Sequence, residues 1–260
     1  MTTVRHAMTY FESSARRYRY VFRGSMFASF LNPILFLSAM GLGLGQLVDQ
    51  QTGEAVIDTF SYVTYLAPGL MATTAMSTGA SDSSWPVVAG LKWLKTYHGV
   101  LATPLTVGGL VLGHVAFVFT RVLFVSLVYG LVAVAFGALE LPRALLAILP
   151  AGLTGLAFGA AVMGFSSYLD RDVGLANLFR FGITPMFLFS GAFFPITQLP
   201  EFIQPLAIAT PLWHGVELTR AAGLGVSTSW HPVLHVLVLA AFTVIGLSVA
   251  RRKMTMRLIS

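Results

Sequence analysis

The stretch FLFSGAFFPITQLPEFIQPLAIATPLWHGVELTR, residues Phe187–Arg220, decides how this chain is built. It is too apolar for an ordinary surface loop, and its prolines prevent one straight helix; they are Pro195, Pro200, Pro205 and Pro211. The pattern predicts a helix that enters a membrane, ends at a Gly/Pro-rich elbow and continues as short apolar helices. Partly inserted segments survive where neighbouring protein or a water-lined cavity satisfies their backbone groups. The stretch therefore favours a pathway through a membrane over a passive anchor.

The composition places this stretch in a polytopic membrane protein. Of 260 residues, 56% are hydrophobic and 10% are charged, whereas soluble domains carry roughly 25% charged residues. The absence of cysteine excludes disulfides, thiolate metal sites and cysteine nucleophiles. The net charge of +6 indicates membrane topology rather than nucleic-acid binding, because the basic residues lie between apolar spans. The first 23 residues hold five arginines and no long apolar run, so no cleavable signal peptide is predicted.

The gaps between charged residues predict six membrane spans, since a spanning helix needs about 20 mostly apolar residues. The spans are Gly24–Val48, Thr59–Ser81, Leu105–Phe136, Ala144–Leu169, Phe181–Pro200 and Pro232–Ala250. The predicted fold is an all-α polytopic membrane protein with a single domain over 1–260. It comprises a cytoplasmic amphipathic helix over 1–23, a six-span region over 24–250 and a cytoplasmic tail over 251–260, with re-entrant outer helices between spans five and six.

The basic residues predict the orientation. Thirteen of the 16 Lys and Arg fall at the two termini and in the loops after the second and fourth spans, which all lie on one side. Six acidic residues fall opposite: Asp49, Glu54, Asp58, Glu140, Glu201 and Glu217. Because Lys and Arg concentrate in cytoplasmic loops, both termini are expected in the cytoplasm and residues 187–220 at the outer face.

Two segments outside the spans are candidates for contacts with partners. Thr9–Arg23 is amphipathic, and it fits either a helix lying on the anionic inner leaflet or a helix that links the membrane domain to a cytoplasmic partner. Trp85–Pro104 mixes aromatic and basic residues. It fits either a docking helix for another protein or a membrane-surface hairpin with aromatic anchors.

Charged and small residues inside the spans are interpreted as structural. Arg121 is expected to face the bundle interior or snorkel to the inner leaflet rather than touch substrate, and Asp82 is interpreted in the same way. Their spacing gives no indication that the two pair. Glycines four residues apart predict close helix packing; they are Gly109 and Gly113, and Gly155 and Gly159.

The motifs of enzymes and metal sites are not found. His231 and His235 are four residues apart but have no obvious third ligand, so no metal site is predicted. The chain has no GxxxxGK[ST] pattern with which to bind and hydrolyse ATP. It is therefore expected not to be an enzyme.

Two stretches resemble the membrane subunit of ABC-2 type exporters, in the branch of nodulation-factor and drug exporter permeases. One is KTYHGVLATPLTVGGLVLG, residues Lys95–Gly113, and the other is Phe187–Arg220, where FLFSGAFFPITQLP and PLWHGVELTR are similar to the family's FLSGxxFPxxxLP and PLxHxxxxxR. The family often has an acidic residue at position 98, which is histidine here, so Lys92 and Lys95 are the alternative charged contacts.

The resemblance implies partners and roles. Two copies of the permease would work with two copies of an ATP-binding cassette ATPase subunit, in contact with membrane lipids and without nucleic acid. ATP and Mg²⁺ would bind the partner, so this chain would need no cofactor. The coupling helix would span Leu91–Val100, with Leu91, Lys92, Trp93, Leu94, Lys95, Thr96, Tyr97 and His98 as its contact residues. The implied outer gate is Gly191, Phe193, Phe194 and Pro195, and the implied substrate path is Met71, Met76, Met186 and Phe189.

The function that the resemblance implies is outward movement of a hydrophobic or amphipathic molecule across a bacterial cell membrane, of the drug, lipid-linked or lipo-oligosaccharide type. Two alternatives come from other classes. A secondary transporter would need ion-coupling groups near the membrane midplane, and the spans hold only Asp82, at an edge. A lipid-modifying enzyme would need a polar cluster at the interface, for which the outer candidates are Glu201, His214, Glu217 and Arg220.

Overall fold

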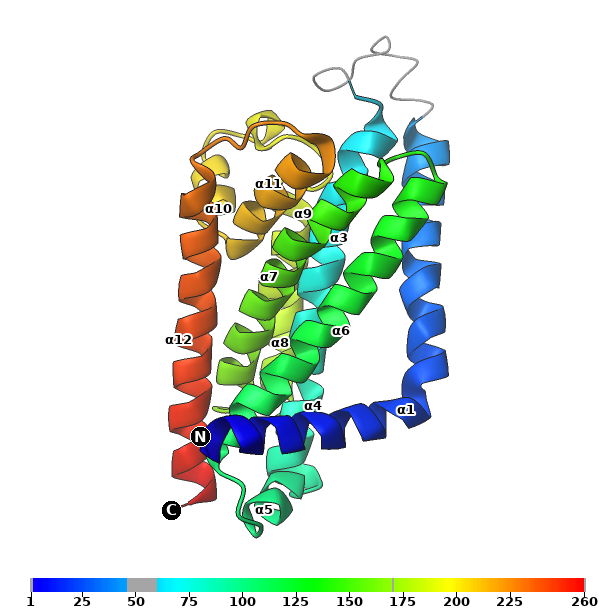
Figure 1. Cartoon of the computed structure of the whole chain (residues 1–260). Coiled ribbons are helices and arrows are strands. Elements are labelled where there is room, and N and C mark those ends of the chain that lie inside the picture. The colour runs from blue at the N-terminus through cyan, green and yellow to red at the C-terminus, as the bar shows by residue number, and fades with distance from the viewer. Residues whose placement is uncertain (1, 46–59, 170, 260) are drawn as a thin grey trace.

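The computed structural model describes residues 2–45, 60–169 and 171–259, which form helices joined by turns and short loops (Figure 1). The elements are α1 (Thr2–Phe36), η1 (Leu37–Gly45), α3 (Tyr62–Asp82), α4 (Trp85–Val88), η2 (Ala89–Trp93), α5 (Thr96–Leu101), α6 (Val107–Ala135), α7 (Leu141–Ser166), α8 (Val173–Asn177), η3 (Leu178–Ile183), α9 (Thr184–Phe189), η4 (Ile196–Gln198), α10 (Gln204–Ile208), α11 (Pro211–Leu224) and α12 (Pro232–Leu258). The predictions that involve Val48, Asp49, Glu54, Asp58 and Thr59 fall outside the described residues.

Four helical stretches of the described chain are long and apolar enough to cross a membrane: Thr3–Met40, Val107–Ala135, Leu141–Ser166 and Pro232–Leu258. They match the first, third, fourth and sixth predicted spans. The predicted second span is α3, where a row of Ser and Thr lowers the hydropathy. The predicted fifth span is the shorter apolar run Val173–Phe189, which contains Arg180. The count of six therefore stays a prediction.

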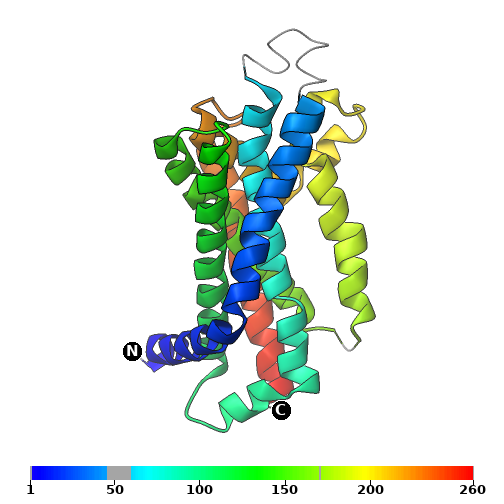
Figure 2. The same ribbon diagram turned by 90° about the vertical axis from the view of Figure 1, so that its right-hand side faces the viewer.

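Both termini lie at the same end of the molecule, here called the terminal end, and α10 and α11 lie at the opposite end, here called the elbow end (Figure 1). The first part of α1 lies across the terminal end, and the helix then bends and runs toward the elbow end (Figures 1 and 2). The helix that begins in 1–23 continues to Phe36, and α12 continues through the predicted tail to Leu258. The predicted division into cytoplasmic and membrane-spanning parts stays a prediction.

Small residues let the long helices approach closely, as their spacing predicts. A side chain at Gly79 of α3 would overlap the carbonyl oxygen of Gly155 in α7, and Gly109 and Gly113 of α6 meet the first turns of α1. The apolar core between these contacts includes Leu66 of α3, whose side chain is fully buried. Backbone-to-backbone contact of this kind replaces the hydrophobic driving force that lipid does not provide.

The elbow predicted in residues 187–220 is present, but its boundaries differ. The preceding helical run begins at Val173 rather than Phe181 and ends at Phe189 rather than Pro200. The chain turns there because Gly191 adopts φ 79°, a conformation that glycine takes without strain. The short helices η4, α10 and α11 follow.

The predicted single helix over Leu91–Val100 is wrong. The π-helical turn η2 ends at Trp93, and α5 begins at Thr96. Lys95 lies between them in the left-handed conformation, with φ 50° and ψ 27°. Because a right-handed helix does not continue through such a residue, the segment is divided into two short helices.

Candidate functional site

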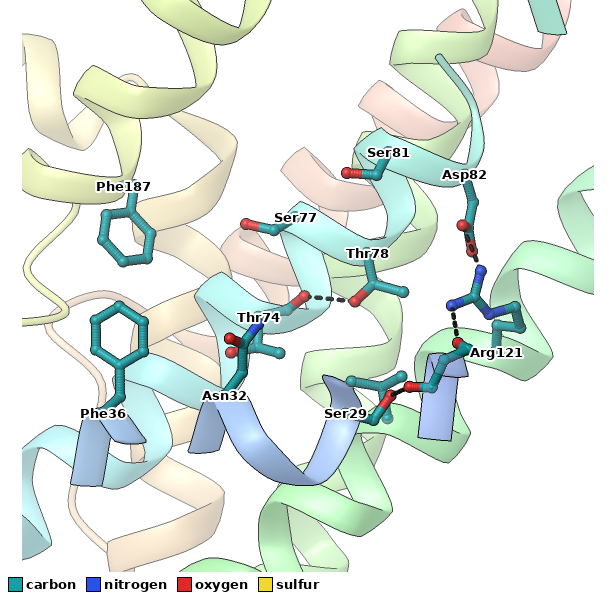
Figure 3. Close-up of a pocket in the computed structure, with 12 residues that line it drawn as sticks. Ser29, Asn32, Phe36, Thr74, Ser77, Thr78, Ser81, Asp82, Arg121 and Phe187 are labelled. Carbon is teal, nitrogen blue, oxygen red and sulfur yellow. Dashed lines mark hydrogen bonds and ion pairs between the residues drawn. The ribbon is translucent and has the colours of Figure 1, made fainter. Parts of the chain in front are cut away.

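A polar groove of about 370 Å³ lies between α1, α3, α6 and α9 (Figure 3). Its polar lining recurs at the spacing of one helical face on each of two helices. On α3 these residues are Thr74, Ser77, Thr78 and Ser81, and on α1 they are Ser25, Ser29 and Asn32. Polar groups are costly against lipid and usually face a bundle interior or a water-filled cavity. The groove is therefore a candidate site for a polar ligand.

Several groups in the polar groove have hydrogen-bonding capacity left. The hydroxyls of Thr78 and Ser29 donate to carbonyl oxygens one turn earlier on their own helices, each at 2.8 Å. The side chains of Asn32, Thr74 and Ser77 make no hydrogen bond to another described residue. An amide and two hydroxyls can each donate and accept, so a ligand rich in hydroxyl groups would satisfy them.

An ion pair lies at the end of the polar groove nearer the termini. Arg121 Nη1 stands 2.5 Å from Asp82 Oδ1, and Arg121 Nη2 donates to Ser25 Oγ at 3.0 Å (Figure 3). The guanidinium carbon is 4.7 Å from the centre of the Tyr18 ring. Arg121 thereby joins α1, α3 and α6. Both ions are largely buried, so removing one would leave an uncompensated charge.

Aromatic rings lie at the other end of the polar groove. The ring centres of Phe36 and Phe187 are 6.2 Å apart and those of Phe187 and Phe193 are 5.1 Å apart, both edge to face. We call these three residues the aromatic cluster. It brings Phe193, a predicted gate residue, next to the groove. Phe194 and Pro195 are half-buried in the elbow, and Gly191 is buried there. Their role as a gate stays a prediction.

The predicted substrate path does not coincide with the polar groove. Met71 and Met76 are fully buried in the packed interior of the subunit. Met186 and Phe189 line a separate apolar pocket of about 210 Å³ beside α10. Substrate contact by any of these four residues remains untested, and the polar groove is the better candidate on its chemistry.

A second space, here called the inner chamber, has a volume of about 370 Å³ and lies at the terminal end. The first part of α1 lines it with Tyr10, Arg17 and Tyr18, and the α4–α5 segment lines it with Tyr97. The rings of Tyr10 and Tyr97 meet edge to face, 6.4 Å between centres. Burial raises the pKa of Tyr97 well above its usual value, so the phenol stays protonated.

The predicted coupling residues divide into an inner and an outer group. Leu91 and Tyr97 are buried against the body of the subunit, and Lys92 and Thr96 are half-buried. The outer group is exposed; it comprises Trp93, Leu94, Lys95 and His98. Trp93 stacks on Trp85, with 6.3 Å between ring centres. The exposed rings and Leu94 form an apolar patch at the terminal end.

The outer polar residues serve as structural ties. Arg220 Nη2 donates to the carbonyl oxygen of Gly191 at 2.7 Å, and its guanidinium lies 4.0 Å from the centre of the Tyr65 ring. Glu217 lies 3.7 Å from Arg220 and accepts hydrogen bonds from the backbone and hydroxyl of Ser229, at 2.8 and 2.7 Å. These contacts hold α11 to the elbow.

His235 contacts His214 rather than His231, which lies four residues before it in the sequence. Nδ1 of His214 in α11 and Nδ1 of His235 in α12 are 2.9 Å apart, both side chains buried. His231 instead accepts a hydrogen bond from the backbone of Val233 at the start of α12. Among the described residues no three His, Cys, Asp or Glu side chains are grouped to hold a metal ion.

The helical fold agrees with what comparison of the sequence shows. Residues 10–224 match the ABC-2 type transporter family, and the chain belongs to that family. It is a multi-pass membrane permease subunit, which works with an ATPase subunit. The ABC-2 membrane domain has no nucleotide-binding site and no cofactor of its own.

Three relatives are each named nodulation protein J. That of Rhizobium meliloti is 29% identical over 228 residues, which cover 85% of this chain and 82% of the relative. That of Rhizobium leguminosarum bv. viciae is 30% identical over 237 residues, covering 90% and 88%. That of Sinorhizobium fredii is 32% identical over 239 residues, covering 91% and 87%. The similarity therefore extends over most of the chain.

The sequence analysis missed the polar groove, although the spacing of its polar residues is visible in the sequence. The intervals between Thr74, Ser77, Thr78 and Ser81 are those of one helical face. The same holds for the row on α1. What the spacing does not show is that the two rows line the same space, because that depends on how α1 bends.

Proposed function

We propose that this chain is the membrane-spanning subunit of an ATP-driven exporter that moves an amphipathic molecule out of a bacterial cell. The observation that carries the proposal is the polar groove, with the Asp82–Arg121 ion pair at one end and the aromatic cluster at the other. The ion pair and the hydroxyl groups suit the polar head of such a cargo, and the aromatic cluster suits its apolar tail. The lipid-linked and lipo-oligosaccharide types fit this description better than a wholly apolar drug.

Six crossings and two cytoplasmic ends are part of the proposal. Both termini lie at one end of the molecule, as an even number of crossings requires (Figure 1). The 21 residues of α3 would extend roughly 30 Å at about 1.5 Å per residue, which matches the hydrocarbon core of a bilayer. The predominance of Lys and Arg at the terminal end supports a cytoplasmic location for it.

The exposed patch around Trp85, Trp93 and Leu94 is the proposed docking surface for the ATPase subunit. It lies at the terminal end, and the buried Tyr10–Tyr97 contact connects it to α1. Aromatic residues on an exposed patch are typical anchors of protein interfaces. Two permease copies and two ATPase copies would complete the exporter.

The test is reconstitution of the chain in liposomes with the ATPase subunit encoded beside it. The probe is a glycolipid with a fluorophore that a membrane-impermeant reductant quenches. We expect movement of the probe to require ATP and to stop when the ATPase carries a hydrolysis-defective site. The proposal is wrong if the two proteins do not co-purify and no ATP-dependent movement occurs. Movement that a protonophore abolishes while ATP persists would instead indicate a secondary transporter.

A further inference from the structure

The polar groove and the inner chamber meet at two residues. Among the described residues that line the two spaces, only Asp82 and Arg121 line both. The chamber lies on the side of the pair nearer the termini, and the groove lies on the other. The ion pair is therefore the partition between them.

The ion pair, formed by residues of α3 and α6, also contacts α1. Arg121 donates to Ser25 and lies over the ring of Tyr18, and the Tyr18 hydroxyl donates to Ser25 at 2.7 Å. A shift of α1 relative to α6 would pull on the guanidinium directly. The partition thus depends on the position of the helix that also carries half of the groove's polar lining.

Both ions keep buried atoms without a partner. Within the described chain Asp82 Oδ2 and Arg121 Nε make no hydrogen bond. A buried polar atom left unsatisfied costs free energy, so the closed pair leaves room for a better-satisfied arrangement. A hydroxyl can accept from Arg121 and donate to Asp82, because it is both an acceptor and a donor.

We propose that Asp82 and Arg121 form an inner gate, whose opening joins the inner chamber and the polar groove into one path for a hydroxyl-rich head group. The head group replaces, at each ion, the interaction that the ions give up when they separate. This proposal rests on the proposed function in that a gate needs a cargo to pass and that the terminal end faces the cytoplasm. Its test requires neither the cargo nor the ATPase.

The absence of cysteine makes the gate measurable. Ser77→Cys places the chain's single thiol in the middle of the polar groove. In inside-out vesicles a membrane-impermeant maleimide approaches from the terminal end, where the inner chamber lies. We expect slow labelling with the native pair and labelling faster by about tenfold in Asp82→Asn or Arg121→Gln, because closed states of this kind typically open about 0.1–10% of the time. Exchanging the two charges, Asp82→Arg with Arg121→Asp, should restore slow labelling.

Two controls separate gating from damage to the fold. Thr103→Cys, at an exposed position after α5, should label quickly and equally in every background. Glu12→Gln, which breaks the exposed Glu12–Arg16 pair, should leave labelling of Ser77→Cys unchanged. Ser25→Ala leaves the ion pair in place and removes the hydrogen bonds that Arg121 and Tyr18 donate to Ser25. For this milder variant we expect about a twofold increase.

The head-group chemistry is tested in the Arg121→Gln background. Octyl glucoside, below its micellar concentration, should slow labelling of Ser77→Cys, whereas octyl dimethylamine oxide, which carries no net charge and no hydroxyl, should not. Equal labelling with native and broken pairs, with Thr103→Cys unaffected, would overturn the gate. Lack of protection by the glucoside would overturn the assignment of its ligand. Neither result depends on whether ATP-driven export is observed.

Discussion

Arg220 holds the elbow through three neighbours at once: the Gly191 carbonyl, the Tyr65 ring and the Glu217 carboxylate. Its side chain is buried, so the charge is tolerated only because these partners replace water. A neutral side chain of similar length keeps the volume but removes the hydrogen bond from Arg220 to the Gly191 carbonyl and the positive charge opposite Glu217.

We expect Arg220→Met to lower the free energy of unfolding by about 3 kcal/mol, the typical cost of breaking a buried ion pair by removing one partner. The measurement is thermal unfolding of the purified protein in detergent. Arg180→Met, at an exposed arginine of η3, is the matched control and should change stability little. Equal effects of the two substitutions would contradict the role assigned to Arg220.

Gly79 sets how closely α3 and α7 approach. A methyl group there would overlap the backbone oxygen of Gly155, which cannot move aside as a flexible side chain can. Gly79→Ala should therefore destabilise the protein by about 1–3 kcal/mol, the usual range for overpacking. Gly24→Ala adds the same methyl group in open space and should be neutral or slightly stabilising. The measurement is the unfolding temperature of each variant compared with that of the native chain. Equal temperatures for the two variants would contradict the close approach assigned to Gly79.

At the scale of elements, the break at Lys95 determines the shape of the surface at the terminal end. It turns α5 away from η2, so that Tyr97 packs inward while Trp93 and Leu94 remain exposed. Its left-handed conformation is readily adopted by asparagine but is strained for a β-branched residue. The conformation and the charge of this position can thus be separated by substitution.

Lys95→Asn and Lys95→Val both remove the charge, and only the valine opposes the left-handed backbone. We expect Lys95→Val to weaken co-purification of the ATPase subunit by about tenfold or more, since strain of this kind costs of order 1–3 kcal/mol. Lys95→Asn should retain most of the binding. If both substitutions weaken binding equally, the charge rather than the turn is what the partner recognises.

At the scale of the whole molecule, the described chain leaves much apolar surface uncovered along α12 and the second part of α1. Exposed apolar side chains on spanning helices are expected against lipid or a second subunit. The polar groove, however, lies next to the same part of α1, and its polar lining is poorly suited to lipid. A second copy facing the groove would shield it.

We therefore expect the complex with the ATPase subunit to contain two copies of this 28.0 kDa chain. Light scattering coupled to size-exclusion chromatography, with the detergent contribution subtracted, measures the mass directly. Two permeases and two ATPases are the expected composition. A complex with a single permease would contradict the proposed assembly.

Much of the architecture can be predicted from the sequence because it depends on local properties. Apolar length and charge gaps locate the long helices, and the prolines after Phe187 locate the elbow. The Asp82–Arg121 pair is different: its members are 39 residues apart, and their meeting depends on the packing of three helices. The break at Lys95 is also hidden, because lysine rarely adopts a left-handed backbone and no glycine marks the turn.

One helix connects the two ends of this arrangement. Near its start α1 carries Tyr10, which packs against Tyr97 beside the proposed docking patch, and further along it carries Ser25, Ser29 and Asn32 of the polar groove. If docking of the ATPase shifts α1, the groove changes with it. Thermodynamic reciprocity then requires the converse, so that cargo in the groove alters the affinity of the ATPase by the same factor. A bound head group would therefore change the binding of the ATPase subunit before ATP is hydrolysed.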